Sequence, residues 1–326
     1  MKQILLEAPG RFAEREAEAP VQAAGHALVR IEKVGVCGSD FHAFAGRHPI
    51  YTYPRIIGHE LSGVVEHAPV NSKGVERGDR CAIEPYLTCG TCHACKRGKN
   101  NCCERLQILG IHVDGGMQEY LSVPTELLHK STRLTLDQLA LVETLGIGAH
   151  AVERSELKEG ERALIVGAGP IGIAVAQFAA EAGADVHIVE KSEWRRAFVE
   201  RMGYSSSETA DGRAADAVFD ATGSATAMAE SLSHVVPSGK LIFVGLTRDP
   251  VSIDDSLFHR KEVTLFASRN SFGLFPRIIR LIEEGRIDTS HWVTDRLGLS
   301  DVVSQFSSLT ERKTLIKAIV DVNHPD

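Results

Sequence analysis

Five of the seven cysteines lie in one stretch, "CGTCHACKRGKNNCC", which covers residues 89–103. Cys89, Cys92 and Cys95 are separated by two residues each, and a longer step leads to Cys102 and Cys103. Thiolates spaced in this way can converge on one tetrahedral Zn²⁺, and four cysteines leave no open position, so the site would be structural. Cys102 is the expected spare, although the spacing alone does not decide between the two adjacent cysteines.

Two other functions are open to this cysteine stretch. Cys92 and Cys95 form a C-x-x-C pair, but the strand and helix pattern of a thioredoxin-like redox site does not surround them. A zinc ribbon that binds nucleic acid suits the local lysines and arginines, whereas the formal net charge of −7 argues against nucleic acid as a partner. Disulfides are disfavoured because seven is an odd number and the N-terminus has no signal-peptide core. We therefore predict structural zinc and a cytoplasmic protein.

A second group with metal-binding chemistry lies upstream, in "VGVCGSDFH" and "GHELSG". Taken singly, Cys37 suits a core, His59 a turn and Glu60 a solvated surface. Together they offer a thiolate, an imidazole and a carboxylate, which is a donor set for an open zinc site. A thiolate and a carboxylate would neutralise Zn²⁺ and leave a Lewis acid that binds and acidifies an alcohol.

Three neighbours of these candidate ligands supply supporting chemistry. Asp40 is a candidate to orient His59, because its carboxylate could accept from the ring nitrogen of His59 that does not bind the metal. Ser39 and His42 offer a hydroxyl and an imidazole, which suit a proton that must travel outward.

The stretch "ERALIVGAGPIGIAVAQFAAEAGADVHIVEK" is typical of a dinucleotide site. An apolar strand leads into Gly167-x-Gly169-x-x-Gly172, an apolar helix follows, and a second strand ends at Glu190. Such glycines allow the pyrophosphate to approach the helix N-terminus closely. Because "GAGP" interrupts the uncharged run 163–180, we interpret that run as a strand, a turn and a helix and not as a membrane span.

The acid at the end of the second strand favours NAD over NADP. Glu190 can accept hydrogen bonds from ribose hydroxyls and would repel a 2′-phosphate, while Lys191, Arg195 and Arg196 could serve a phosphate. The candidate cofactor-binding residues are Gly167, Gly169, Pro170, Ile171, Gly172, Glu190, Lys191, Arg195 and Thr222.

The order of expected elements predicts an α/β protein with two parts. Residues 1–144 read as short strands separated by glycine and proline turns, whereas 145–270 alternate strands with helices. The interval 204–216 is short for a complete strand and helix, so the third unit of the alternation is expected to be abbreviated. A helix and a returning strand are expected after residue 270.

With these motifs in order, the chain resembles the zinc-dependent medium-chain dehydrogenase/reductase family along essentially its whole length. The matching motifs are "GVCGSDFH", "GHELSG", "CGTCHACKRGKNNCC" and "VGAGPIG". The resemblance implies a GroES-like catalytic domain over 1–144 and 271–326, with a structural-zinc lobe at 89–103, and a doubly wound Rossmann domain over 145–270. It assigns Cys37, His59 and Glu60 to the catalytic zinc. It assigns Cys89, Cys92, Cys95 and Cys103 to the structural zinc.

The resemblance also implies the reaction, in which a zinc-activated alcohol loses its proton through Ser39, the nicotinamide ribose and His42 and its hydride to NAD⁺. Glu143 stands where the polyol branch has a further acidic zinc-site residue, although Thr144 replaces the proline that often follows. "NCCERLQILGIHVDGGMQEYLSVP" and "FHRKEVTLFASRN" resemble the sugar-acid and polyol branch, which implies a substrate similar to L-galactonate. The candidate substrate residues are His112, Glu119 and Asn270.

The family resemblance leaves several alternatives and expectations. Simple alcohols, threonine-type substrates and other polyols are alternative substrates. A zinc-free reductase of enones or quinones and a binding protein without turnover are alternative functions. A homodimer or homotetramer is expected, with no membrane or nucleic-acid partner.

Overall fold

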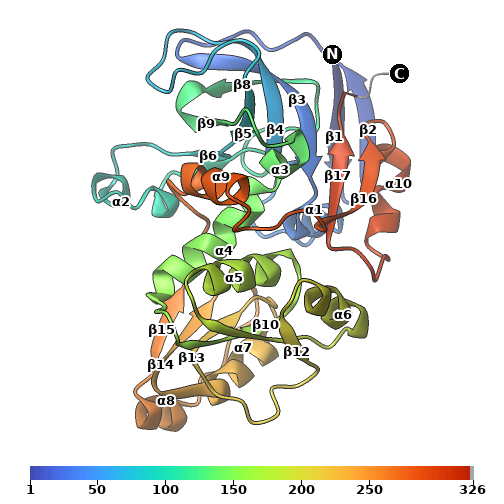
Figure 1. Ribbon diagram of the computed structural model, residues 1–326. Helices are drawn as coiled ribbons and strands as arrows, with labels where there is room; N and C mark the ends of the chain where they lie inside the picture. The colour runs from blue at the N-terminus through green and yellow to red at the C-terminus, as the bar shows by residue number, and fades with distance from the viewer. Residues whose placement is uncertain (324–326) are drawn as a thin grey trace. The chain divides into compact units, whose positions relative to one another are not determined.

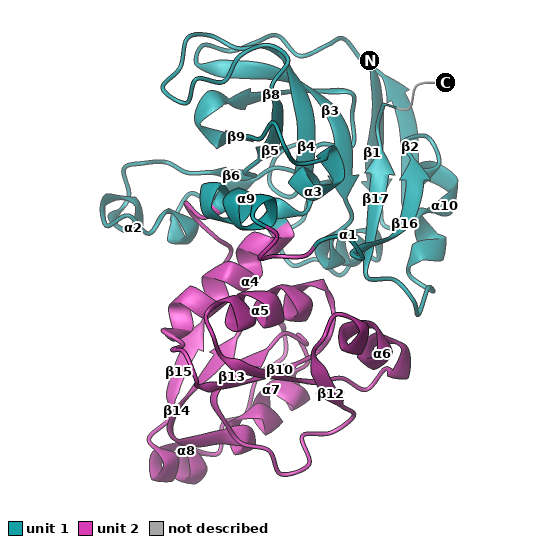
Figure 2. Cartoon of the chain, in the orientation of Figure 1, with its two compact units in different colours: residues 1–143, 275–284, 289–326 teal, residues 144–274, 285–288 magenta. Residues whose placement is uncertain are grey.

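The computed structural model describes residues 1–323, which form two compact units (Figure 2). Among the described residues, unit 1 comprises 1–143, 275–284 and 289–323, and unit 2 comprises Thr144–Leu274 and Gly285–Asp288. The two units differ from the predicted division at Thr144, 271–274 and 285–288, which the sequence places in the catalytic domain and which belong to unit 2.

Unit 1 is built on a seven-stranded sheet with the order β16-β17-β3-β4-β5-β9, in which β8 also pairs with β3 (Figure 1). All pairs in this sheet are antiparallel except β16 with β17. Its strands are β3 (His26–Gly35), β4 (Glu60–His67), β5 (Arg80–Ile83), β8 (Tyr120–Pro124), β9 (Leu128–Lys130), β16 (Val293–Gly298) and β17 (Lys317–Asp321). Two short sheets accompany it: β1 (Lys2–Ala8) with β2 (Arg11–Glu16), and β6 (Tyr86–Leu87) with β7 (Gln107–Ile108).

The helices of unit 1 are short and lie around these sheets. They are α1 (Gly38–Phe44), α2 (His93–Lys96), η1 (Asn100–Cys102), η2 (Thr125–Leu127), α3 (Leu136–Ala140), α9 (Phe275–Glu283) and α10 (Val302–Leu309). Alternating apolar residues of the strands make the core, and four aromatic rings of α1, β2 and α10 meet in it. The helix expected after residue 270 is α9, and the expected returning strand is β17.

Unit 2 is built on a six-stranded sheet of parallel strands, in the order β12-β11-β10-β13-β14-β15. The strands are β10 (Arg162–Val166), β11 (Asp185–Val189), β12 (Ser205–Ser207), β13 (Ala215–Asp220), β14 (Val235–Phe243) and β15 (Thr264–Ala267). The helices are α4 (Val142–Ser155), which begins in unit 1, α5 (Pro170–Glu181), α6 (Glu193–Arg201), α7 (Ala225–Ser231), η3 (Leu232–His234) and α8 (Asp255–Lys261). Buried Val, Ile, Leu and Ala dominate the central strands β10, β11, β13 and β14, as expected for a parallel sheet covered on both faces, whereas the residues of the edge strands β12 and β15 are half-buried or exposed.

The glycine stretch of unit 2 folds as the sequence predicts. β10 ends at Val166, Gly167 turns with φ +100°, and α5 begins at Pro170. A Cβ at Gly172 would lie 1.8 Å from the carbonyl oxygen of Gly167, so only glycine allows this turn and helix to pack so closely. The abbreviated third unit is confirmed, because β12 has three residues and no helix stands between it and β13 within the described chain.

No helix within residues 1–323 combines the length and the apolar character that a membrane span requires. The uncharged run 163–180 is divided between β10 and α5.

Candidate active site and cofactor site

Three adjacent strands of unit 1 bring two buried charges together. Glu60 is the first residue of β4, opposite Gly35 of β3, and Lys317 is the first residue of the neighbouring strand β17. The Lys317 ammonium donates to both carboxylate oxygens of Glu60, at 2.6 and 2.7 Å, and to the carbonyl of Val36 at 3.3 Å. A Cβ at Gly35 would lie 2.2 Å from Glu60 Oε2, so the absent side chain makes room for the pair. Although burial alone lowers the pKa of Lys317, Glu60 raises it above its ordinary value.

Cys37 and His59 lie beside Glu60. One ligand atom each from Cys37, His59 and Glu60 lies within 4.8 Å of the others. Cys37 is the N-cap of α1, and its backbone N–H donates to Asp40 Oδ2 at 2.8 Å in a capping box. Asp40 thereby fixes the start of the helix that carries Cys37.

The predicted link from Asp40 to His59 is longer than a hydrogen bond. His59 Nδ1 lies 3.9 Å from Asp40 Oδ1, and it has no hydrogen-bond partner among the described residues. Burial alone lowers the pKa of His59, but the thiol of Cys37 and the carboxylate of Asp40 raise it well above its ordinary value. Burial raises the pKa of Asp40.

Ser39 and His42 lie on α1, three residues apart and therefore on one side of the helix. The Ser39 hydroxyl is 3.5 Å from His59 Nε2. Ser39 is half-buried and His42 is exposed, so the two side chains lead from the buried cluster towards solvent.

Glu143 lies in the first turn of α4, and its side chain is buried. It does not belong to the set of mutually close ligand atoms formed by Cys37, His59 and Glu60. Its Oε1 accepts a 2.5 Å hydrogen bond from the hydroxyl of Tyr86, which is also buried. Burial raises the pKa of Glu143, whereas His59, which is close enough to act on it, lowers it.

The four cysteines Cys89, Cys92, Cys95 and Cys103 form a second cluster, with their sulfur atoms within 4.8 Å of one another. Cys103 Sγ lies 3.5 Å from Cys89 Sγ and 3.9 Å from Cys92 Sγ. Cys103 is buried and Cys102 is exposed. The structure therefore brings in Cys103 and leaves Cys102 outside the cluster.

Backbone amides point at the sulfur atoms of this lobe. Cys103 Sγ accepts from the N–H groups of Cys89 and Arg105, and Cys89 Sγ accepts from that of Cys92. Backbone N–H donors, first that of Thr91, lower the pKa of Cys89 to about 5. Donors of this kind stabilise thiolates, which is the form that binds metal.

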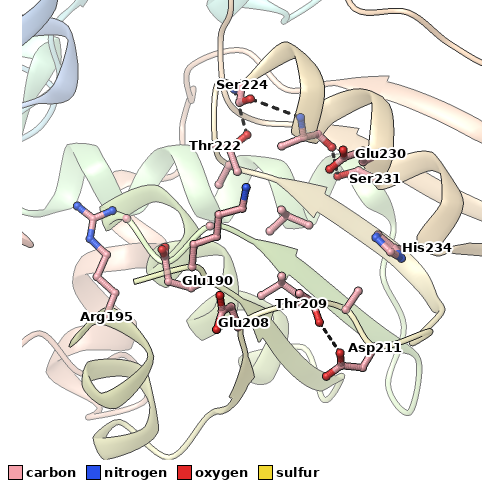
Figure 3. Close-up of a pocket in the computed structure, with 18 residues that line it drawn as sticks. Glu190, Arg195, Glu208, Thr209, Asp211, Thr222, Ser224, Glu230, Ser231 and His234 are labelled. Atoms are coloured by element: carbon pink, nitrogen blue, oxygen red, sulfur yellow. Dashed lines mark hydrogen bonds between the residues drawn. The ribbon is translucent and has the colours of Figure 1, made fainter. Parts of the chain in front are cut away.

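Unit 2 holds a cavity of about 560 Å³ at the carboxyl ends of β10, β11 and β13 (Figure 3). Its size and position suit a nucleotide. Of the predicted cofactor residues, Gly167, Gly169, Glu190, Lys191, Arg195 and Thr222 line it. Pro170, Ile171 and Gly172 belong to the first turn of α5 beside it and are not among its lining residues.

Backbone N–H groups hold the acid of this cavity in place. Glu190 Oε2 accepts from Ala168 N at 2.7 Å, and Oε1 accepts from Ser192 N at 2.8 Å. The Arg196 guanidinium donates to the carbonyls of Glu190 and Lys191 and does not line the cavity, whereas Arg195 does. Glu208 adds a second acid to the same wall (Figure 3).

Asp220, at the end of β13, positions Thr222. It is buried, and its Oδ1 accepts from the backbone N–H and the hydroxyl of Thr222 at 2.9 and 2.7 Å. Ser231 donates to its other oxygen at 3.0 Å.

Two of the three candidate substrate residues hydrogen-bond to backbone outside these clusters. His112 Nδ1 accepts from Ile108 N at 3.1 Å, and Glu119 Oε2 accepts from Lys2 N at 2.8 Å, so both support local backbone. Asn270 lies in unit 2 with φ +49°, and its Nδ2 is buried without a hydrogen-bond partner in the described structure.

The donor sets fit the groups that the sequence predicts. Four converging thiols match structural zinc. The sulfur of Cys37, the imidazole nitrogen of His59 and the carboxylate oxygen of Glu60 match an open zinc site. Sequence reasoning missed Lys317 and Tyr86. The lysine inside the apolar strand "LIKAIV" was a readable sign, because a lysine is rarely buried unless it is paired. Tyr86 offered none.

Comparison with known proteins agrees with this geometry. Residues 23–133 match the family model of the alcohol dehydrogenase GroES-like domain, and residues 170–284 match that of zinc-binding dehydrogenases. L-galactonate-5-dehydrogenase of Escherichia coli K12 is 34% identical over 98% of both chains. 2-dehydro-3-deoxy-L-galactonate 5-dehydrogenase of Pseudoalteromonas atlantica is 32% identical over 94% of this chain and 95% of its own.

Solved structures give the same picture. An alcohol dehydrogenase (rspB) of E. coli CFT073, complexed with NADH, superposes with a TM-score of 0.91 at 28% identity over 99% of both chains. A zinc-binding dehydrogenase of Sinorhizobium meliloti 1021, bound to NADP, superposes with a TM-score of 0.90 at 26% identity over 98% of this chain and 99% of its own. The predicted fold class, a Rossmann sheet with a β-rich GroES-like domain, is confirmed.

Proposed function

This chain belongs to the zinc-type alcohol dehydrogenase family, and on that premise we propose that it oxidises a secondary alcohol of a sugar acid or polyol with NAD⁺. The observation that carries the proposal is the presence of two kinds of site in one chain. Cys37, His59 and Glu60 form an open donor set in unit 1, and a nucleotide-sized cavity with a held acid lies in unit 2.

Cys37, His59 and Glu60 would hold the catalytic zinc, with Glu143 as a further acid beside them. Bound there, zinc would supply a Lewis acid that stabilises the developing alkoxide. Lys317 would keep the charge of this centre balanced: with Zn²⁺ it supplies three positive charges, which match the negative side chains of Cys37, Glu60 and Glu143. Cys89, Cys92, Cys95 and Cys103 would hold the structural zinc.

Ser39 and His42 would move the proton. The Ser39 hydroxyl lies next to His59 in the cluster, and exposed His42 stands on the same side of α1. A hydroxyl can pass a proton on as it accepts one, and an imidazole can release a proton to solvent. Asp40 supports this arrangement through the cap of α1.

The cavity of unit 2 would hold the adenosine end of NAD. Glu190, fixed by two backbone amides, presents its carboxylate where ribose hydroxyls bind, and Glu208 adds negative charge to the same wall. Two acids disfavour a 2′-phosphate, although Lys191 and Arg195 line the cavity as well. Gly167, Gly169 and Gly172, with Pro170 and Ile171, would receive the pyrophosphate at the start of α5.

The substrate class rests on relatives whose names specify sugar acids: L-galactonate and 2-dehydro-3-deoxy-L-galactonate dehydrogenases. His112, Glu119 and Asn270 remain candidates for contacts with it. The homodimer or homotetramer and the cytoplasmic location stay predictions.

Turnover of a defined panel tests this proposal. The purified, zinc-loaded protein would be mixed with L-galactonate, other aldonates, polyols and simple alcohols, each with NAD⁺ or NADP⁺, and reduced cofactor would be followed by absorbance. We expect a sugar acid or polyol to react with NAD⁺ far faster than any simple alcohol. Turnover confined to simple alcohols, or to NADP⁺, would contradict it.

A further inference from the structure

The two acids of the candidate metal centre have different partners. Glu60 is held through both oxygens by the buried ammonium of Lys317. Glu143 is held through Oε1 by the hydroxyl of Tyr86. A cation offsets the charge of the carboxylate that it binds, whereas a neutral hydroxyl orients a carboxylate and leaves its charge in place.

The hydrogen bond between Tyr86 and Glu143 is a costly one to lose. Both side chains are buried, at 3% and 5% exposure, so water cannot replace either partner. Glu143 acts electrostatically on His59, and Glu60 acts on Glu143, so the carboxylate belongs to the centre although it lies outside the three mutually close donors. Its orientation therefore bears on the metal, and Tyr86 is the residue seen to fix it.

Tyr86 also has a rigid base. It lies in β6, which ends two residues before the cysteine lobe begins at Cys89. β6 pairs with β7, and Tyr86 lies opposite Ile108 in that pair. The tyrosine ring packs with Leu106, Ile108 and Ile111 in a small core that includes Cys103. A side chain locked in this way can hold a carboxylate to one direction.

We propose that Tyr86 is a positioning residue of the catalytic metal centre, whose hydroxyl holds Glu143 by Oε1 so that Glu143 meets the metal or its exchangeable ligand through Oε2. This inference rests on the proposed function. It assigns Tyr86 no contact with substrate and no proton transfer. Its consequence is that removal of the hydroxyl changes the coordination of the metal through Glu143.

Cobalt spectroscopy tests this directly. Protein with zinc in the cysteine lobe and Co²⁺ at the catalytic centre would be prepared for the wild type, Y86F, E143A, the double variant Y86F/E143A and Y204F. Tyr204 is the control, since it is a half-buried tyrosine of unit 2 whose pKa burial raises to about 12. Visible absorption reports the coordination of Co²⁺, and competition with a chelator gives its affinity.

We expect Y86F to change the visible cobalt bands and to weaken Co²⁺ binding about tenfold, as loss of an outer partner of a metal site does. Y204F should match the wild type. In the E143A background the tyrosine substitution should add less than about a twofold change, because its route through Glu143 is gone.

E143D keeps the test decisive if Y86F does not fold. Aspartate retains the charge but is one methylene shorter, so it cannot keep both its place and its bond to Tyr86, and it should show the same altered cobalt bands. Wild-type bands and affinity in Y86F, or an undiminished effect of Y86F when Glu143 is absent, would overturn the inference and leave the proposed function standing. A wild-type protein that binds metal only in the cysteine lobe would overturn both.

Discussion

The two candidate metal centres of unit 1 are built in opposite ways. The lobe takes all four ligands from residues 89–103, and the backbone amides that donate to its sulfur atoms belong to Cys89, Cys92 and the nearby Arg105. The catalytic centre draws on α1, the start of β4 and the start of α4, and it depends on Lys317, which lies 257 residues beyond its partner Glu60.

This difference teaches how each centre depends on the fold. A metal site whose ligands come from one short segment can bind its ion with few long-range contacts, so the ion stabilises the segment around it. A centre assembled from distant strands exists only once the sheet has formed, and it must satisfy charges that the sheet buries. The first should therefore govern local stability and the second activity.

Loss of a catalytic ligand should give the largest effect. We expect H59A to lower kcat/KM on the order of 10³-fold, because a metal that polarises the reacting oxygen supplies several kcal/mol to the transition state. Steady-state kinetics on the best substrate of the panel would measure it. C102S, which removes the exposed cysteine outside both clusters, should keep wild-type turnover. An H59A variant with wild-type activity would show that His59 is not a ligand of the catalytic metal.

Breaking the buried ion pair should cost stability. K317M leaves the Glu60 carboxylate buried without its cation, and we expect the free energy of unfolding to fall by about 3 kcal/mol. K33M is the matched control, because the Lys33 side chain is 20% exposed and its partner Asp321 keeps Arg296. The control should lose less than about 1 kcal/mol. Urea unfolding would compare the two, and equal losses would show that Lys317 is an ordinary surface-type cation.

Loss of a lobe cysteine should have a smaller and local effect. C89S should lower the free energy of unfolding by about 2 kcal/mol, since a structural ion contributes its binding energy to folding. Protease cleavage within residues 89–103 should rise in parallel. C102S again serves as control, and a C102S protein that is as damaged as C89S would mean that Cys102 closes the site.

The smallest effect concerns a thiol that belongs to neither centre. Burial raises the pKa of Cys81 to about 12, so almost no thiolate forms at pH 8. In the zinc-loaded protein, iodoacetamide should modify exposed Cys102 and leave Cys81 intact, as peptide mass spectrometry would show. Chelation of zinc should then open the cysteines of the clusters but still not Cys81, unless unit 1 unfolds.

What the sequence predicts follows the same division. The cysteine spacing predicted the lobe, and the run from "ALIV" to "DVHIVE" predicted β10, α5 and β11, because these features are local and periodic. The short third unit was also readable from chain length alone.

The pairing of residues at the catalytic centre was beyond the sequence. Lys317 meets Glu60 only because β17, β3 and β4 are neighbours in that order, and nothing local records strand order. Tyr86 meets Glu143 across 57 residues of chain. The expected role of Asp40 in orienting His59 likewise depends on an exact distance: Asp40 Oδ1 lies 3.9 Å from His59 Nδ1, while Asp40 Oδ2 accepts from the backbone N–H of Cys37.

Zinc counting by native mass spectrometry tests the central claim most directly. Intact wild-type, C37S and C89S proteins would be measured side by side, with turnover recorded on the same samples. We predict two zinc ions per wild-type chain, and one in C37S, which should be stable and inactive. We predict one in C89S, with loss confined to the lobe and activity retained while the protein stays folded. Two zinc ions and full activity in C37S would contradict the account.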